Sequence, residues 1–280
     1  MINSRIYRVG VELKEGCTVE GADLAIRALR DACISFDEVI SVSDQEKPYP
    51  WNLLHLPQVV DINQRIKKVV KDAKNKEYFP LTFGGDHSLA IGSISAIAQN
   101  NTAVFWVDAH GDCNTDQTTL SGRIHGMPLA VLQGDGVADL TALVDIPLKK
   151  ENIVLFGIRS LDPKEEIYIQ EKGIRMYTMD KIREMGFFNA LSEALDYLKG
   201  FDVHLSFDLD SIDPRECKGV NTPVYSGFRV KEALQLIARS FEECNITSMD
   251  IVEYNPIFDE GNTIQIVKSI NRIVTNQKGV

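Results

Sequence analysis

Residues 103–112 read AVFWVDAHGD, an apolar run of five residues that leads directly into Asp108, His110 and Asp112. So short an apolar run is typical of a β-strand that is buried on both faces. We expect seven further strands, at residues 6–11, 38–42, 79–83, 152–156, 174–177, 203–207 and 248–252. Amphipathic segments between the strands predict helices, most clearly at residues 62–73, 190–199, 231–243 and 263–274. Strict alternation of strands and helices predicts a parallel sheet with helices on both faces, within one α/β domain over residues 1–280.

The composition is that of an ordinary globular protein, with 44% hydrophobic and 25% charged residues in a chain of 280. Thirty basic and forty acidic residues give a net charge of −10 with the histidines neutral. Such a charge disfavours nucleic acid and anionic membranes as partners and attracts a cationic substrate. No apolar run approaches the ~18 residues that span a bilayer. Residues 1–5 carry no apolar leader, so we expect no secretory signal.

The five cysteines are scattered, at Cys17, Cys33, Cys113, Cys217 and Cys244. No CxxC pair occurs, which excludes zinc ribbons and thioredoxin-like redox chemistry. We therefore expect a reducing, cytoplasmic location. Cys113 directly follows the DAHGD motif, but no base is placed to activate it. We expect a packed thiol there rather than a nucleophile.

Polar residues follow four of the expected strands at the point where each strand ends. The ends of parallel strands meet at one edge of the sheet, where such folds bind their ligands. We therefore expect these side chains to build one site. They are His87 after the strand at 79–83, Asp108, His110 and Asp112 after the strand at 103–107, Asp208 and Asp210 after the strand at 203–207, and Glu253 after the strand at 248–252.

The aspartates and histidines of this set predict a two-metal centre. In an extended chain, the spacing of two residues points Asp108, His110 and Asp112 to the same side. Crowded carboxylates repel one another, and two divalent cations would offset the charge of four aspartates. A set of imidazole and carboxylate ligands without thiolate favours Mn²⁺ or a similar octahedral ion over structural zinc. We expect one ion on His87 and Asp112 and the other on His110 and Asp210, with Asp108 and Asp208 bridging.

Each residue of this set also has a simpler interpretation when it is taken alone. A single aspartate at a strand end usually caps a helix or forms a turn, and a single histidine usually packs in the core. We expect such a structural role for His204, at the start of the strand that leads to Asp208. Metallophosphatases carry a similar DxH motif, but the GDxxD and GNHE-like segments that accompany it there do not occur in this chain. The joint occurrence of three motifs in one order favours the metal centre.

The segments GGDHS (84–88), DAHGD (108–112) and SFDLDSIDP (206–214) together resemble the ureohydrolase family. Residues 108–128, DAHGDCNTDQTTLSGRIHGMP, are similar to the motif of bacterial arginases almost residue for residue, and HGMP is more like arginases than agmatinases. The resemblance runs from the glycine-spaced segment 16–21 to the helix after Glu253. It implies a three-layer α/β/α sandwich around an eight-stranded parallel sheet, two Mn²⁺ per subunit on the six ligands named above, and a homo-oligomer, either a trimer or a hexamer.

The resemblance also implies a role for individual residues in the hydrolysis of L-arginine to L-ornithine and urea by a metal-bridging hydroxide. Glu253 would bind the guanidinium group, Asp112 would pass a proton to the leaving amine, and His125 would shuttle protons to solvent, although it could also be a loop-packing histidine. The amino-acid end of the substrate would be held by Asn114 and Ser121 at the α-carboxylate and Asp162 at the α-amino group, with Thr119 and Thr222 in support. For Ser121 and Thr119, ordinary loop hydrogen bonding is an equally good interpretation.

Three residues depart from the family pattern. Arg123 replaces an asparagine, Asn221 replaces the glycine before Thr222, and Ser226 replaces the first glycine of a Gly-Gly pair. We expect Arg123 to reach the substrate's α-carboxylate, with a solvated loop arginine as the alternative. The other two departures could alter the rim of the pocket.

Two other functions stay open at this point. Another amidinohydrolase of agmatinase type would act on a substrate without an α-carboxylate, which Asn114, Ser121 and Asp162 argue against. A non-catalytic arginine-binding protein would keep the fold without turnover, which the intact ligand set, His125 and Glu253 argue against.

Overall fold

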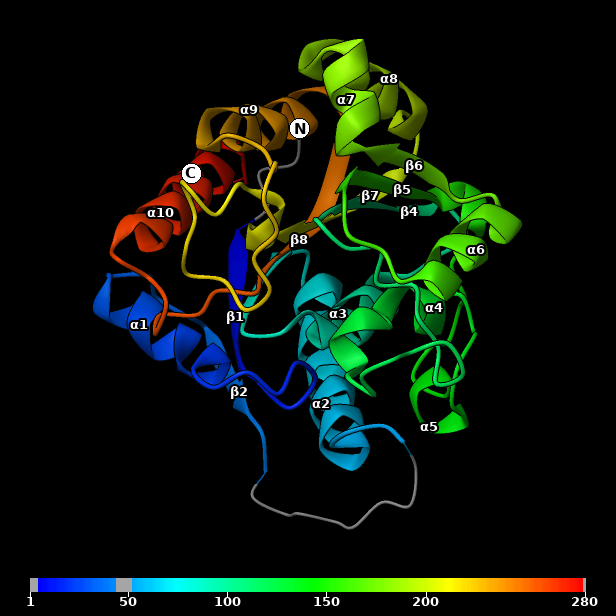
Figure 1. Ribbon diagram of the computed structural model, residues 1–280. Helices are drawn as coiled ribbons and strands as arrows, with labels where there is room; N and C mark the ends of the chain where they lie inside the picture. Colours follow the sequence, from blue (N-terminus) through cyan, green and yellow to red (C-terminus); the bar gives the residue numbers. More distant parts are fainter. Residues whose placement is uncertain (1–4, 44–51, 279–280) are drawn as a thin grey trace.

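The computed structural model describes residues 5–43 and 52–278 (Figure 1). The expectation that there is no secretory signal concerns residues 1–5, and residues 1–4 lie outside the described residues. Eight parallel strands form one sheet in the order β2-β1-β3-β8-β7-β4-β5-β6. All eight expected strands are confirmed, although β8 begins earlier than the sequence pattern indicated. Their bounds are β1 (Ile6–Glu12), β2 (Glu38–Ser41), β3 (Phe79–Gly84), β4 (Thr102–Val107), β5 (Ile153–Ile158), β6 (Arg175–Thr178), β7 (Asp202–Asp208) and β8 (Asn245–Val252).

Helices cover both faces of the sheet, which confirms the three-layer α/β/α architecture (Figure 1). The four clearest amphipathic segments all form helices, each somewhat longer than expected. One face carries α1 (Ala25–Asp31), α7 (Met179–Met185), α8 (Phe187–Leu198), α9 (Val230–Glu243) and α10 (Asn262–Lys278). The other carries α2 (Leu56–Asn75), α3 (Ala90–Ile97), α4 (Pro128–Leu132), α5 (Ala138–Thr141) and α6 (Pro163–Lys172).

The central strand β4 is covered on both faces, which explains why it is apolar at every position from Ala103 onward. Phe105 and Val107 pack into the core on one face, whereas Val104 and Trp106 pack into the core on the other. All four side chains are fully buried. Burial of each large apolar side chain contributes about 1.5–3 kcal/mol, so a strand between two helix layers is stabilised from both sides.

The order of the strands brings the chemistry-bearing strand ends together. β3, β8, β7 and β4 are neighbours in the sheet, so the residues that follow them share one edge. Short 3₁₀ turns succeed two of these strands: η2 (His87–Leu89) follows β3 and η5 (Leu209–Ser211) follows β7. A further turn, η3 (Ile124–Gly126), comes from the long connection after β4. Among the described residues, no helix is both long and apolar enough to cross a membrane.

Candidate active site

His87 lies at the centre of a group of carboxylates. Its Nδ1 is 3.1 Å from Oδ2 of Asp108, 3.2 Å from Oδ2 of Asp112 and 3.0 Å from Oδ2 of Asp208. The imidazole is buried, and Nε2 lies 2.8 Å from the hydroxyl of Ser206. None of the three carboxylate oxygens sits where Nδ1 could form a hydrogen bond, so this buried nitrogen has no such partner in the described part of the chain. A ring nitrogen that faces several carboxylates without a hydrogen bond suits a metal cation as partner.

Asp108 connects this group to a second one around His110. Oδ1 of Asp108 lies 3.4 Å from Nδ1 of His110, which is also 3.1 Å from Oδ2 of Asp210. Two hydrogen bonds fix the Asp108 carboxylate: Nε1 of Trp106 donates to Oδ2 at 2.9 Å, and the backbone N–H of His110 donates to Oδ1 at 2.7 Å. Two groups of His and Asp ligand atoms, which share Asp108, could therefore each hold a metal ion.

The route by which these side chains converge differs from the expected one. β4 ends at Val107, so Asp108, His110 and Asp112 do not lie on an extended strand. The chain turns instead, and Asp112 adopts a left-handed φ of 48°. Asp210 likewise lies in the turn η5, where its N–H donates to Oδ1 of Asp208 at 2.7 Å. The expectation of an extended chain was wrong because the aspartates bond to their own backbone and bend it.

Burial leaves the crowded carboxylates poorly stabilised by the protein alone. Burial, together with the charge of Asp108, raises the pKa of Asp112 to about 6. Burial raises the pKa of Asp208 as well, with added repulsion from Asp210 and Asp108. Cations would relieve this repulsion, and the imidazole and carboxylate donors fit divalent ions of octahedral preference.

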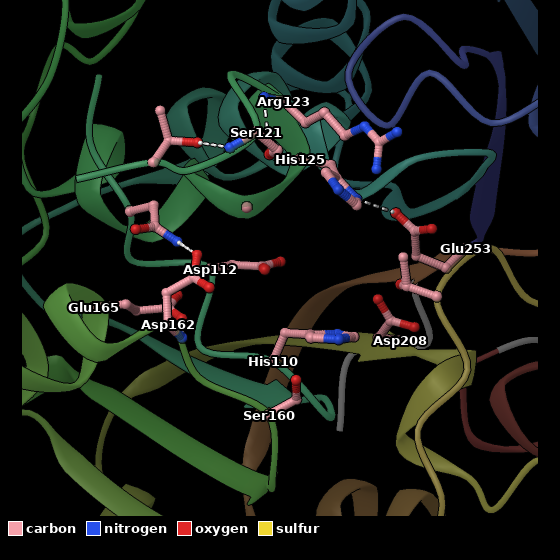
Figure 2. Close-up of a pocket in the computed structure, with 14 residues that line it drawn as sticks. His110, Asp112, Ser121, Arg123, His125, Ser160, Asp162, Glu165, Asp208 and Glu253 are labelled. Atoms are coloured by element: carbon pink, nitrogen blue, oxygen red, sulfur yellow. Dashed lines mark hydrogen bonds and ion pairs between the residues drawn. The ribbon is translucent and has the colours of Figure 1, made fainter. Parts of the chain in front are cut away.

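A pocket opens above these residues and collects the other expected site residues (Figure 2). His110, Asp112 and Asp208 line it, whereas His87, Asp108 and Asp210 are buried beneath. The remaining lining residues include every side chain that the sequence assigned to catalysis or substrate binding: Asn114, Thr119, Ser121, Arg123, His125, Asp162, Thr222 and Glu253.

Glu253 follows β8 with a left-handed φ of 64°, and its carboxylate is held on both oxygens. Oε1 accepts the backbone N–H of His87 at 2.8 Å and lies 3.4 Å from Nδ1 of His125. Oε2 accepts Nδ2 of Asn221 at 2.6 Å. Burial would raise the pKa of Glu253, but the contacts with His125 and Asn221 outweigh it and lower that pKa. The group is therefore a charged acceptor suited to a cationic ligand.

The opposite wall of the pocket is polar. Nδ2 of Asn114 donates to Oδ2 of Asp162 at 3.0 Å. Thr119 accepts the backbone N–H groups of Ser121 and Gly122 through Oγ1, at 3.3 and 3.0 Å, so it makes the loop hydrogen bonds of the simpler interpretation. Arg123 donates from Nε to Oγ1 of Thr18 at 2.9 Å and so ties two loops together at the pocket rim.

Glu165 also lines the pocket, although the sequence did not indicate it as a site residue. Its Oε1 accepts the N–H of Cys113 at 2.9 Å, and its Oε2 accepts the N–H of Asp162 at 3.2 Å. Burial is the main cause that raises the pKa of Glu165 to about 7. The sequence does contain a pattern that could have located Glu165. It follows Asp162 by three residues at the start of a helix, which is the spacing of a capping box.

Two further expectations about non-catalytic residues are confirmed. Cys113 is a fully buried thiol packed in the core, as expected, and burial raises its pKa, which disfavours the reactive thiolate. His204 is buried within the sheet, with ring nitrogens 2.8 Å from Oγ of Ser248 and 3.1 Å from Oδ2 of Asp250. It therefore has a structural role away from the pocket.

Comparison with known proteins gives consistent matches over nearly the whole chain. A family model described as the Arginase family matches residues 5–274. An arginase of Bacillus subtilis is 43% identical, over 96% of this chain and 98% of that protein. The solved structure of an arginase from Bacillus caldovelox has a TM-score of 0.89 at 35% identity, covering 99% of this chain and 98% of the other. That of Entamoeba histolytica arginase in complex with L-ornithine has a TM-score of 0.88 at 28% identity, with 100% of each chain covered.

Proposed function

The chain belongs to the arginase family of ureohydrolases, and from this premise we propose that it hydrolyses L-arginine to L-ornithine and urea. The observation that carries the proposal is the arrangement of one pocket. A charged glutamate, Glu253, stands beside a cluster of imidazoles and carboxylates at one end, and the polar pair Asn114 and Asp162 lies at the other. A cationic guanidinium group and an amino-acid head group match these two ends.

Two Mn²⁺ ions per subunit are part of the proposal. His87, Asp112, His110 and Asp210 would hold them, with Asp108 and Asp208 shared between the two. When bound, such a pair supplies activation of water at neutral pH. The support from this chain is the buried Nδ1 of His87, which faces three carboxylates without a hydrogen bond.

The residues above the cluster orient the substrate and move protons. Glu253 accepts paired hydrogen bonds from the guanidinium group and places its carbon above the cluster. Asp112, which lines the pocket beside His110, passes a proton to the leaving amine. His125 exchanges protons between the pocket and solvent, because it faces Glu253 and is partly accessible.

The amino-acid end of the pocket gives the selectivity. Asn114, Ser121 and Arg123 bind the α-carboxylate, and Asp162 binds the α-amino group. Thr119 and Thr222 support these residues, Thr119 through the loop hydrogen bonds and Thr222 by donating from Oγ1 to Oδ2 of Asp210 at 3.0 Å. We place all these residues in one catalytic domain of a cytoplasmic homo-oligomer, a trimer or a hexamer.

Urea release from L-arginine and from agmatine, after loading with Mn²⁺, tests the proposal. We expect rapid release from L-arginine and at least tenfold lower kcat/KM for agmatine, because polar groups left unpaired in the pocket cost about 1–3 kcal/mol each. Equal kcat/KM for both substrates would favour an agmatinase-type enzyme. Binding of L-arginine without urea release from either would show a non-catalytic arginine-binding protein.

A further inference from the structure

Asn221 is a nearly buried asparagine whose amide lies between two other polar side chains. Its Nδ2 donates to Oε2 of Glu253 at 2.6 Å, and its Oδ1 accepts Nδ2 of Asn255 at 2.8 Å. Asn255 is fully buried, and it is held by the carbonyl of Glu20 and the N–H of Ile257. The orientation of the Asn221 amide is therefore determined, because its oxygen must face the amide donor and its nitrogen the carboxylate.

The hydrogen bond from Asn221 to Glu253 fixes the rotation of the Glu253 carboxylate about the terminal bond of its side chain. The backbone of Glu253 is already anchored, since its N–H donates to the carbonyl of Gly85 at 2.7 Å and its φ lies in the left-handed region. Rotation about the terminal bond of a glutamate is otherwise broad. The N–H of His87 on Oε1 and the amide of Asn221 on Oε2 hold opposite oxygens, which defines the plane of the carboxylate.

A carboxylate offers about four acceptor positions, two on each oxygen. The N–H of His87 occupies one position on Oε1 and the amide of Asn221 one position on Oε2, while Nδ1 of His125 lies 3.4 Å from Oε1 at its second position. A guanidinium that binds the free position on Oε2 and takes the place of the His125 contact on Oε1 would use its paired N–H groups on both oxygens. Figure 2 shows the Glu253 carboxylate turned toward His125 at the pocket.

We propose that Asn221 is a positioning residue that holds the plane of the Glu253 carboxylate for a guanidinium ligand. This inference rests on the proposed function, in which Glu253 binds that group. The Asn221 side chain is not needed to hold its own loop in place. Backbone contacts already do so, because the N–H of Asn255 donates to the carbonyl of Gly219 at 2.9 Å and Val220 forms a bridge with Tyr254.

Steady-state kinetics of Asn221→Ala with L-arginine test the inference, after metal content and folding are matched to wild type. We expect kcat/KM to fall about ten- to one-hundred-fold, the range for loss of one hydrogen bond to a charged group. Asn152→Ala is the matched control, because Asn152 is also buried and donates from Nδ2 to a carbonyl, that of Thr102 at 2.8 Å, away from the pocket. The control should lose stability and keep its kcat/KM, whereas unchanged kinetics in Asn221→Ala would overturn the inference.

A double-mutant cycle with Glu253→Ala, which removes both acceptor oxygens, separates positioning from a general structural effect. If Asn221 acts through Glu253, Asn221→Ala causes no further loss of kcat/KM in the Glu253→Ala background. Fully additive losses would contradict the inference.

Crystal structures of wild type and Asn221→Ala give a readout that does not depend on the substrate. We expect the Glu253 carboxylate to rotate or become disordered in the variant while the metal ligands keep their positions. An unchanged carboxylate would overturn the inference even in an active enzyme. Absence of urea release from wild type would instead overturn the proposed function and leave this structural result to decide the positioning role.

Discussion

Nδ1 of His125 lies 3.4 Å from Oε1 of Glu253, although the two residues come from the turn η3 and from the end of β8 (Figure 2). Burial lowers the pKa of His125, but the hydrogen bond and the charge of Glu253 outweigh it, so that pKa lies above its usual value. The imidazole therefore keeps its proton further into the neutral range than a free histidine does.

We expect His125→Asn to lower kcat for L-arginine about a hundredfold, the lower end of the contribution of a general acid or base. We expect kcat of wild type to decline as the pH rises through the pKa of His125, and we expect this decline to be absent in the variant, because the group that loses its proton is gone. Stopped-flow or steady-state pH profiles measure both effects. A loop-packing role would leave kcat and its pH profile as in wild type.

Asp208→Ala should lose at least one metal ion per subunit. Asp208 is buried and its Oδ2 lies 3.0 Å from Nδ1 of His87, so its removal takes away negative charge where we place the ions. Metal analysis after gel filtration measures the effect, with Asp196→Ala at an exposed ion pair as the control. Two ions retained in Asp208→Ala would contradict the bridging assignment.

The stability of the protein should fall as the pH rises because of Glu165. Burial raises its pKa to about 7, whereas the usual pKa of a glutamate, which applies in the unfolded chain, is 4.5. Between these two pH values the folded state keeps a proton that the unfolded chain has lost. The folded state is thus favoured at low pH, and this contribution declines between about pH 4.5 and 7. At matched metal content, the free energy of unfolding of Glu165→Gln relative to wild type should increase by on the order of 1–3 kcal/mol from pH 5 to pH 8, as measured by urea unfolding. A difference that is equal at both pH values would show that Glu165 does not titrate in this way.

The residues that the sequence predicted best are those governed by local patterns. Buried strands such as β4 are visible as apolar runs, and parallel topology carries the residues after them to one edge. His87, Asp108 and Glu253 could therefore be grouped from their places in the sequence. The local path was harder to predict, since the left-handed turn at Asp112 depends on hydrogen bonds that spacing does not reveal.

Contacts between distant segments could not be predicted in the same way. Asn221 stood out only as a departure from a family pattern, and nothing local indicated that its amide would meet Glu253, thirty-two residues further along the chain. Glu165 reaches the N–H of Cys113 across a separation of fifty-two residues. Such pairs follow from the way in which loops pack above the sheet, which depends on the whole fold.

Ser226 is a site where glycine should increase stability. Its φ of 68° lies in the left-handed region, which costs a residue with a side chain about 1–2 kcal/mol. Glycine removes this cost but has more freedom in the unfolded chain, so Ser226→Gly should gain about 0.5–1 kcal/mol. The backbone N–H of Ser226, which donates to Oδ2 of Asp213 at 2.8 Å, is kept in the variant. Urea unfolding measures the gain, and Ser226→Ala, which keeps a Cβ, should show none.

Arg123 offers a test of the amino-acid end of the pocket. It lines the pocket, and its Nε donates to Oγ1 of Thr18 at 2.9 Å, which anchors the guanidinium at the rim. The two terminal nitrogens of an arginine held in this way can still donate to a carboxylate.

We expect Arg123→Ala to raise KM for L-arginine about ten- to one-hundred-and-fifty-fold, since a hydrogen bond to a charged group contributes about 1.5–3 kcal/mol. The α-carboxylate is remote from the reacting carbon, so the contact is equally strong in the ground and transition states and kcat should change little. Agmatine lacks this carboxylate, so its kinetic constants should be nearly the same in the variant and in wild type. Thr18→Val, which removes only the anchor, should raise KM less. An unchanged KM for L-arginine in Arg123→Ala would show that the side chain serves the loop contact alone and that Asn114 and Ser121 must hold the carboxylate without it.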